Sequence, residues 1–314
     1  MTASLEVAVT FYNLFMDDRL LPLKTSFINE IIRAMGLPNN HLTQFLTRFF
    51  FEKSTLRFAD MVLGLDREIE QHGSMQGARW LLKHFITGFD VNGAELIPKT
   101  GPLIIASNHP ASYDGMVITA CVPRQDFKII IGEIPPYRFL PYVSQHAIFS
   151  PPVNNTFGRM QTVRKAIRHL KDGGALLIFP RGGIEPDPAF MPEPDKEFDH
   201  WSRSLEIFLR SVPETKVLVT AVSGVISERI FNHPFTWFRQ SRPDRQRLAF
   251  MYQIIRQTLS GKELFGLRPR VTFGELLSRE TTLASIEGAA RRTLRKHLQG
   301  TYPVTLPDRA SAHS

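Results

Sequence analysis

Apolar positions in the first part of the chain recur at helical spacing, three or four residues apart. In the stretch HLTQFLTRFF this spacing places five large side chains on one helix face: Leu42, Phe45, Leu46, Phe49 and Phe50. A shorter amphipathic run, MQGARWLLKHF, follows at residues 75–85. We therefore predict a helical region over residues 1–88. A Phe-rich stripe belongs to a core more often than to a membrane anchor, and both interpretations stay open for residues 42–50.

From about residue 90 the pattern changes to short apolar runs that alternate with helical stretches. PLIIAS, FKIIIG, GALLIF and KVLVTAVS are typical of buried strands, whereas FGRMQTVRKAIRHL and TLASIEGAARRTLRKHL have helical spacing. This alternation predicts an α/β fold: a mostly parallel sheet flanked by helices, with the helical region 1–88 as an N-terminal appendage. The predicted α/β domain spans residues 89–302, and residues 303–314 are expected to form a disordered tail.

Composition indicates a folded protein with one large domain, alone or with an appendage. The chain has 314 residues, of which 43% are hydrophobic and 22% charged. Its single cysteine, Cys121, excludes an internal disulfide framework and a cysteine-based zinc cluster. No segment approaches about 18 uninterrupted apolar residues, and residues 1–15 have no basic stretch before their apolar part. We therefore expect a cytoplasmic protein, peripheral at the inner face of the membrane, with no signal peptide and no spanning helix.

The positive charge of the chain lies in one segment. The formal net charge is +8, and residues 228–300 hold 14 Lys and Arg against 6 Asp and Glu, which accounts for the whole excess. Such an excess is typical of proteins that meet lipid headgroups, nucleic acid or a phosphorylated ligand. A solvated face kept soluble by its charge explains it equally well. Near the end of the last predicted helix, the helix dipole alone accounts for Arg291, Arg292, Arg295 and Lys296.

The stretch NHPASYD is the strongest candidate for chemistry. It follows the apolar run of PLIIAS, so His109 stands at the end of a predicted strand, where α/β proteins bind their ligands. Asp114 follows five residues later. A neutral imidazole can take the proton of a hydroxyl group, while a carboxylate on its other nitrogen fixes the tautomer and stabilises the imidazolium. The pair is therefore a candidate general base with its orienting group; a loop histidine beside a capping aspartate is the alternative.

NHPASYD resembles the N-H-x-x-x-x-D signature of the glycerolipid acyltransferases, which include the glycerol-3-phosphate and lysophosphatidate acyltransferases. Seventy residues after His109, Phe179 opens FPRGGIEPDP. This stretch resembles the second signature of the family, F-P-E-G followed by Thr/Ser-Arg-Ser. Two softer matches are HAIFSPP, for the G-x-I-F-I-x-R block, and VLVTAVSG, for the closing V-P-V block. The resemblance covers roughly residues 90–226, and the first two signatures stand in the order and spacing of the family.

The resemblance implies transfer of a fatty acyl group from acyl-CoA or acyl-carrier protein to a hydroxyl of a glycerolipid, either a lysophospholipid or a glycerol phosphate. His109 would be the general base and Asp114 would orient it, with no metal and no cofactor besides the acyl thioester co-substrate. Substrate-binding roles are implied for signature residues: Asn108, Phe179, Pro180, Arg181, Gly182, Gly183 and Glu185. The expected partners are the acyl donor, the glycerolipid acceptor and a membrane surface. Nucleic acid is not expected, because no motif that reads it is recognisable.

The second signature departs from the family pattern where the family helps to hold the phosphate of the acceptor. Arg181 stands in place of Glu, Gly-Ile-Glu at 183–185 replaces Thr/Ser-Arg-Ser, and two prolines at 151–152 fall where the I-F-I-x-R block ends in Arg. Arg181 can offer a planar guanidinium to a phosphate from its own position, and Arg159 is a further candidate. Glu185 either replaces the missing carboxylate or pairs with Arg181.

One segment has the composition expected for contact with a bilayer. Residues 231–247, FNHPFTWFRQSRPDRQR, interleave aromatic with basic side chains: Phe231, Phe235, Trp237 and Phe238 with Arg239, Arg242, Arg245 and Arg247. Aromatic rings beside basic groups suit an anionic membrane surface. An aromatic satellite core with a charged rim is the alternative interpretation.

Two other functions are compatible with the sequence. A thioester hydrolase would use His109 and Asp114 to activate water instead of an acceptor hydroxyl, and the acceptor-like loop FPRGG disfavours it. A non-catalytic module would bind anions or membranes through the basic segment 228–300, but this hypothesis leaves NHPASYD unexplained.

Overall fold

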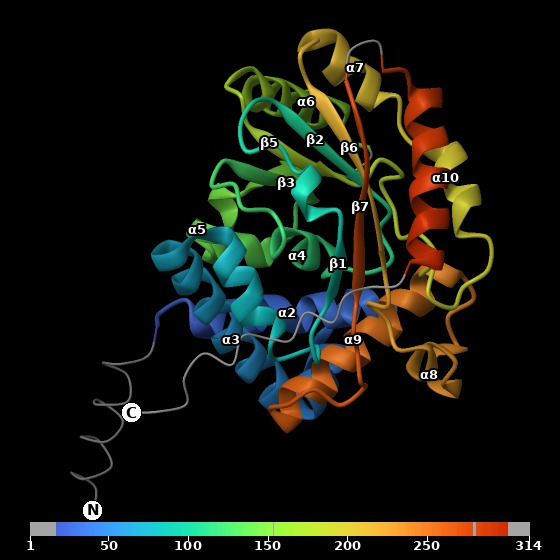
Figure 1. Cartoon of the computed structure of the whole chain (residues 1–314). Helices are drawn as coiled ribbons and strands as arrows, with labels where there is room; N and C mark the ends of the chain where they lie inside the picture. The colour runs from blue at the N-terminus through green and yellow to red at the C-terminus, as the bar shows by residue number, and fades with distance from the viewer. Residues whose placement is uncertain (1–16, 153, 279–280, 301–314) are drawn as a thin grey trace, which may run out of the picture.

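The computed structural model describes residues 17–152, 154–278 and 281–300. Its centre is a sheet with the strand order β1-β7-β6-β2-β5-β3-β4 (Figure 1). The strands are β1 (Asp90–Asn92), β2 (Leu103–Ser107), β3 (Phe127–Gly132), β4 (Ala147–Ser150), β5 (Ala175–Ile178), β6 (Lys216–Ser223) and β7 (Arg270–Leu277). Neighbouring strands are parallel except β6 and β7, which are antiparallel. The predicted α/β fold with a mostly parallel sheet is confirmed.

Helices cover both faces of this sheet. They are α2 (Leu20–Met35), α3 (His41–Leu82), α4 (Asp114–Thr119), α5 (Pro141–Gln145), α6 (Thr156–Lys171), α7 (Ser204–Ser211), α8 (Glu228–Phe231), α9 (Arg242–Ser260) and α10 (Leu283–Gln299). Short 3₁₀ turns are η1 (Ala94–Leu96), η2 (Pro135–Phe139), η3 (Pro194–His200) and η4 (Pro234–Thr236). Buried side chains of α3, α4 and α9 pack on one face, and those of α6, α7 and α10 pack on the other.

The central strand β2 is apolar throughout because both of its faces are covered. Successive side chains of a strand point to opposite faces. Ile105 accordingly packs in the cluster with α3 and α4, whereas Ile104 and Ala106 pack in the cluster with α6 and α10. All five residues of β2 are buried. The loop that follows β2 therefore starts from a rigid position in the middle of the sheet.

The N-terminal helical prediction is confirmed for the described residues, while residues 1–16 lie outside them. Gly36 ends α2 in the left-handed conformation, with φ +69°. Asn40 then starts α3 by accepting from the backbone of Thr43. The second part of α3 buries Leu65 and Leu82 against the sheet, so this helix is also a layer of the α/β domain. The predicted division at residue 88 falls between α3 and β1 and stays a prediction, and the predicted tail 303–314 lies outside the described residues.

The first turns of α3 expose the Phe-rich stripe to solvent. The five side chains are 43–73% exposed: Leu42, Phe45, Leu46, Phe49 and Phe50. The side chains of α3 that pack on α2 lie further along the helix, where Ala59 and Leu63 are buried with Leu23. The interpretation of this stripe as protein core is therefore wrong. The predicted helix is confirmed, but spacing alone does not say whether another element covers the apolar side of a helix.

Candidate active site

The loop after β2 is fastened to the neighbouring strand β6 by Asn108. Its side-chain amide donates to the carbonyl of Val222 at 2.9 Å, and its Oδ1 accepts from the N–H of Val222 at 2.8 Å. These two bonds continue the pairing of β2 with β6 beyond the last strand residue. Asn108 is buried, so the structure gives it a positioning role for the next residue, His109, rather than an open face toward a ligand.

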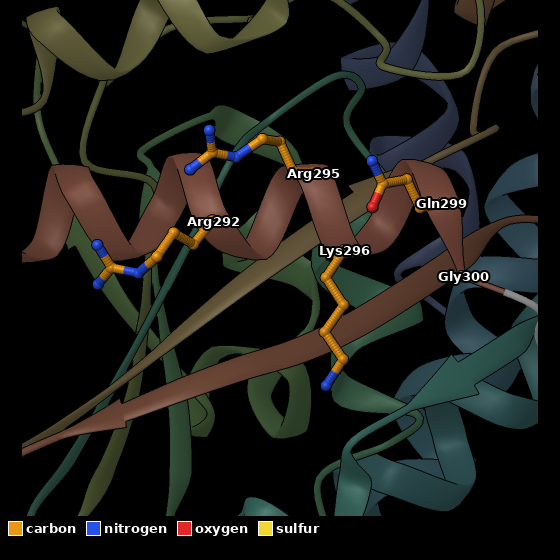
Figure 2. A pocket seen from close by; sticks show the side chains of 5 residues that line it. All are labelled: Arg292, Arg295, Lys296, Gln299 and Gly300. Atoms are coloured by element: carbon orange, nitrogen blue, oxygen red, sulfur yellow. The ribbon is translucent and has the colours of Figure 1, made fainter.

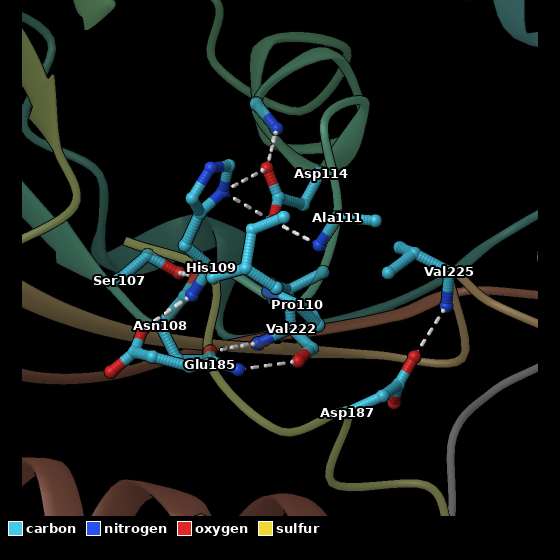
Figure 3. Close-up of polar contacts among 12 residues, drawn as sticks. Ser107, Asn108, His109, Pro110, Ala111, Asp114, Glu185, Asp187, Val222 and Val225 are labelled. Atoms are coloured by element: carbon cyan, nitrogen blue, oxygen red, sulfur yellow. Dashed lines mark hydrogen bonds and ion pairs between the residues drawn. The ribbon is translucent and has the colours of Figure 1, made fainter. Parts of the chain in front are cut away.

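His109 and Asp114 meet as their spacing predicted. Nδ1 of His109 lies 2.8 Å from Oδ2 and 3.0 Å from Oδ1 of Asp114 (Figure 3). The carboxylate is fully buried at the start of α4 and also accepts the backbone N–H of Ala111 at 3.1 Å and of Gly115 at 2.6 Å. Because a carboxylate only accepts hydrogen bonds, in the neutral ring Nδ1 carries the proton and Nε2 holds the lone pair.

The environment of His109 favours its charged form. Burial by itself lowers the pKa of His109, but the Asp114 carboxylate outweighs it and the pKa is raised above its ordinary value. Glu185 adds to this rise, whereas the charge of Arg247 on α9 opposes it. An imidazole with a raised pKa is a stronger base and holds a transferred proton more firmly.

The second ring nitrogen of His109 faces away from the carboxylate (Figure 3). The imidazole stacks on the ring of Phe179, with centroids 4.3 Å apart and planes 25° apart. Its side chain is 23% exposed. Nδ1 is held, the ring plane is fixed, and Nε2 makes no hydrogen bond to a residue that the structure describes. Phe179, predicted as a substrate-binding residue, supports the imidazole directly.

Glu185 contacts the backbone of His109 and not its imidazole ring. Its Oε2 accepts the backbone N–H of His109 at 2.5 Å, and its Oε1 accepts from the Trp201 indole at 3.0 Å. Burial raises the pKa of Glu185 to about 7, against the two hydrogen bonds that lower it. Its own N–H donates to the carbonyl of His109 at 2.8 Å. This carboxylate therefore ties the loop after β5 to the loop after β2.

Asp187, two residues further, fastens the same loop to the end of β6. This buried carboxylate accepts the backbone N–H groups of Gly224, Val225 and Ile226 at 2.8–3.3 Å. Sequence reasoning missed Asp187. The signal was available, because FPRGGIEPDP holds two acidic residues in an apolar setting, and a buried carboxylate needs donors.

Arg181 pairs with Glu197 of η3 rather than with Glu185. Its Nε donates to Glu197 at 3.0 Å, and Arg242 of α9 donates to the other oxygen of the same carboxylate at 2.8 Å. Two guanidinium groups thus share one carboxylate, which leaves a net positive charge beside the His109 loop. Arg181 is partly exposed, and its two terminal nitrogens make no hydrogen bond to a described residue. Glu197 and Arg242 are remote in the sequence and were not predicted as partners.

The other predicted site residues take different positions. Gly182 has φ +70° in a tight turn, where its N–H returns to the Phe179 carbonyl, and Gly183 lies beside the guanidinium of Arg181. The buried Pro180 accepts a backbone bond from Ser202. Arg159 is exposed at the start of α6, and its side chain makes no hydrogen bond or ion pair with the described site residues.

The interleaved segment 231–247 divides into an inner and an outer part. Phe231 and Phe235 pack against the core, whereas Trp237 and Phe238 are 63% and 59% exposed. Its arginines all have internal contacts: Arg239 and Arg247 with Asp244, Arg242 with Glu197, and Arg245 over the ring of Phe231. The satellite-core interpretation holds for the inner part, and two aromatic side chains remain for a surface role.

A basic hollow of about 460 Å³ lies on α10, lined by Arg292, Arg295, Lys296, Gln299 and Gly300 (Figure 2). None of these residues belongs to the loop after β2 or the loop after β5. Arg292 is paired with Glu275 of β7. The remaining charges lie at the end of the helix, where its dipole favours them. This hollow is therefore not the centre of the chemistry.

Two further properties concern metal binding and membrane spanning in the described part of the chain. It holds no group of three His, Cys, Asp or Glu side chains placed to bind a metal ion. None of its helices has the length and apolar character needed to span a bilayer.

The fold and the His–Asp contact define an α/β domain with an imidazole–carboxylate pair at the end of a central strand. Residues 88–202 match the family model described as Acyltransferase. No curated protein matches the chain. Among solved structures, the chain is similar to the 1-acyl-sn-glycerophosphate (LPA) acyltransferase PlsC from Thermotoga maritima, with 17% sequence identity and a TM-score of 0.44, covering 90% of this chain and 98% of that chain.

The match of residues 88–202 to the acyltransferase family model agrees with the family recognised from the two signatures. The matched range contains His109, Asp114 and the FPRGG loop. The domain is that of an enzyme that transfers acyl groups. This finding favours an enzyme over the non-catalytic basic module.

Proposed function

We propose that the protein transfers a fatty acyl group from acyl-CoA or acyl-carrier protein to a hydroxyl of a glycerolipid, with His109 as the general base. The observation that carries the proposal is the asymmetry of the imidazole: Nδ1 is held at 2.8 Å by a buried carboxylate, whereas Nε2 makes no hydrogen bond to a described residue. A base of this kind needs a proton donor in front of it, and a hydroxyl group is the donor that acyl transfer supplies.

The proposed reaction runs without a covalent enzyme intermediate. The acceptor oxygen attacks the thioester carbonyl carbon while its proton moves to Nε2 of His109. Asp114 stabilises the imidazolium that forms, as its position on Nδ1 allows. When the tetrahedral intermediate collapses, the carbon–sulfur bond breaks and the imidazolium returns the proton to the thiolate. The products are the acylated acceptor and a free thiol, and His109 is neutral again.

Arg181 is the residue that we propose for the phosphate of the acceptor. Its Nε is held by Glu197, so the guanidinium has a fixed position while its two terminal nitrogens stay available. A fork of two N–H donors suits phosphate oxygens. Glu185 is assigned to the support of His109 instead, because both of its oxygens accept bonds from buried groups.

We propose further that the protein docks on an anionic bilayer, at the inner face of the membrane, through the exposed stripe of α3. Basic side chains flank this stripe at Arg48, Lys53 and Arg57, all exposed. A bond from Arg239 to the carbonyl of Met35 places the exposed Trp237 and Phe238 beside the turn between α2 and α3. Aromatic rings that enter the headgroup layer next to basic groups are stabilised by burial and by anionic lipid.

Thiol release from a long-chain acyl-CoA tests the proposed reaction. Release is measured alone and with glycerol 3-phosphate, lysophosphatidate or a neutral lysolipid, and the acylated product is identified. We expect release that requires one of these acceptors and falls about 100-fold or more in His109→Ala. Release without any acceptor would establish the hydrolase instead. An unchanged rate in a folded His109→Ala protein would refute the role of His109.

Vesicle sedimentation tests the proposed docking. The Phe45→Ser/Phe49→Ser protein should partition about tenfold less onto vesicles that contain anionic lipid, because two exposed rings lose their apolar burial. Ile207→Ser on α7, a helix on the other face of the sheet, is the matched control at 48% exposure. Equal partition of both variants would show that the stripe does not touch the membrane.

A further inference from the structure

We propose that Gln246 of α9 is a positioning residue for His109, acting through the backbone of the loops after β2 and β5; the proposal rests on the function proposed above. Gln246 is fully buried. Its Nε2 donates to the carbonyl of Pro110 at 3.0 Å and to the carbonyl of Glu185 at 2.8 Å. One side-chain amide thus joins Pro110, the residue after His109, to Glu185, which holds the backbone of His109.

The bonds of Gln246 complete a ring of contacts. Glu185 accepts from the backbone N–H of His109 and donates its own N–H to the carbonyl of His109. Gln246 then holds the next carbonyl of the first loop and the carbonyl of Glu185 itself. Proline has no N–H, so its carbonyl is the one polar backbone group with which the loop can be held at Pro110. Without Gln246, this carbonyl and that of Glu185 lose the bonds that the structure gives them.

The orientation of Gln246 is itself fixed. Its Oε1 accepts from Arg242 at 2.5 Å, so the amide nitrogen must face the two carbonyls. Arg242 is held in turn by Glu197, which also binds Arg181. Arg181, which we propose for the phosphate, and the loop that carries His109 are therefore connected through α9. None of these contacts touches the ring of His109, so Gln246 acts on its position and not on the reacting atoms.

Catalysis is sensitive to such positioning. A displacement of about 1 Å at a reacting group can cost about 100-fold in rate. The ring of His109 is bound at Nδ1 by Asp114, which lies on α4. A shift of the His109–Pro110 backbone therefore stretches the His109–Asp114 bond and turns Nε2 away from the acceptor. Substrate binding, which uses other groups, is not expected to change to the same degree.

The chain supplies its own matched control on the same helix. Gln257 is also buried, and its Nε2 donates to the carbonyl of Phe85 at 2.7 Å, at the end of the α3 layer. Replacing either glutamine by leucine removes a buried amide of the same size from the same helix and leaves backbone carbonyls without their donor. Both variants should lose stability, but only Gln246 contacts the loops that hold His109.

The experiment compares Gln246→Leu with Gln257→Leu in the full-length protein. We expect kcat to fall about 10- to 100-fold in Gln246→Leu with little change in KM for donor or acceptor, and to stay near the wild-type value in Gln257→Leu. Thermal unfolding midpoints are measured for both. A fall in kcat that is equal in the two variants, or absent from Gln246→Leu, would overturn the proposal.

A second measurement does not depend on turnover. In protein labelled with ¹⁵N-histidine, the Nδ1–H signal of His109, assigned by its loss in His109→Gln, reports the bond to Asp114. We expect Gln246→Leu to shift or broaden this signal and Gln257→Leu to leave it in place. An unchanged signal in Gln246→Leu would overturn the proposal even if the enzyme is active. Absence of acyl transfer in the wild-type protein, together with the expected shift, would refute the proposed function alone.

Discussion

Asp114→Asn removes one charge from the site and almost no volume. In the wild-type protein the carboxylate accepts four contacts: two from Nδ1 of His109, one from Ala111 N–H and one from Gly115 N–H. An asparagine has one oxygen and one NH₂ group. The N–H of Gly115 makes the shortest backbone bond to this side chain, at 2.6 Å, and it keeps the asparagine oxygen at the position of Oδ1. The NH₂ group therefore takes the position of Oδ2 beside His109. It then donates to Nδ1, and the proton of the imidazole moves to Nε2.

With the proton on Nε2, this nitrogen cannot act as the base toward an acceptor hydroxyl. General-base catalysis contributes about 10²–10⁴-fold, and the lost carboxylate no longer stabilises the imidazolium. We therefore expect kcat to fall about 1000-fold, which corresponds to about 4 kcal/mol in the activation barrier. The buried N–H of Ala111 loses its acceptor, at a cost of about 1–3 kcal/mol in the free energy of unfolding.

The assay is the pH dependence of kcat/KM for thiol release in the presence of the acceptor. We expect the wild-type enzyme to lose activity as the pH falls through the raised pKa of His109, because a protonated ring cannot accept a proton. In Asp114→Asn the largest influence that raises this pKa is gone, while burial and Arg247 still lower it. The acid limb of the residual activity should therefore move to lower pH.

Asp66→Asn is the control for the loss of a buried carboxylate. Asp66 is fully buried, accepts the N–H groups of Tyr142 and Val143 at 2.9 Å, and pairs with Arg19. It joins α3 to α5 and has no contact with His109. The variant should lose stability but keep the wild-type kcat and pH profile. An unchanged kcat in Asp114→Asn, or an acid limb that stays in place, would refute the assignment of Asp114 as the orienting group.

Two further predictions concern the loop after β5. Arg181→Gln should raise KM about tenfold for a phosphorylated acceptor but not for a neutral one, because one charge-assisted contact to phosphate is lost; equal KM changes for both acceptors would contradict a phosphate contact. Glu185→Gln should remove a pH dependence of stability. The folded pKa of about 7 exceeds the ordinary 4.5, so the folded wild-type protein binds more protons and loses about 3 kcal/mol of stability as the pH rises from 4.5 to 7. Denaturant unfolding at pH 5 and pH 8 should show this loss in the wild-type protein and not in the variant, and parallel changes in both would contradict it.

The strand-and-loop part of the site could be predicted because it is local in the sequence. An apolar run ends at Ser107, His109 follows in the loop, and Asp114 begins the next helix, so a few residues determine the contact. The same holds for the turn at Gly182, where φ is positive. Residues that are close along the chain have few ways to arrange themselves, and their spacing carries that information.

Partners that come from remote segments could not be predicted in this way. Gln246 lies 136 residues from Pro110, and Arg242 lies 45 residues from Glu197. Their contacts depend on how α9 and η3 pack, which no single segment encodes. The regular placement of Gln246, Gln253 and Gln257 on one buried side of α9 was a readable signal, because an amide in an apolar setting must find backbone partners.

Within the loop after β5, the departures of this chain from the family pattern fall on two sides, one exposed and one buried. Arg181 is exposed and faces outward, whereas Glu185 and Asp187 are buried and hold backbone groups of His109 and of the β6 end. We expect the outward position to meet a bound acceptor, whereas the inward residues fix the loop that carries Arg181. The His109–Asp114 pair lies outside this variation. We therefore expect a changed outer side chain on this loop to alter which acceptor is bound and to leave the His109–Asp114 contact in place. Exchange of Arg181 should therefore change acceptor preference through KM, and exchange of Glu185 or Gln246 should change kcat.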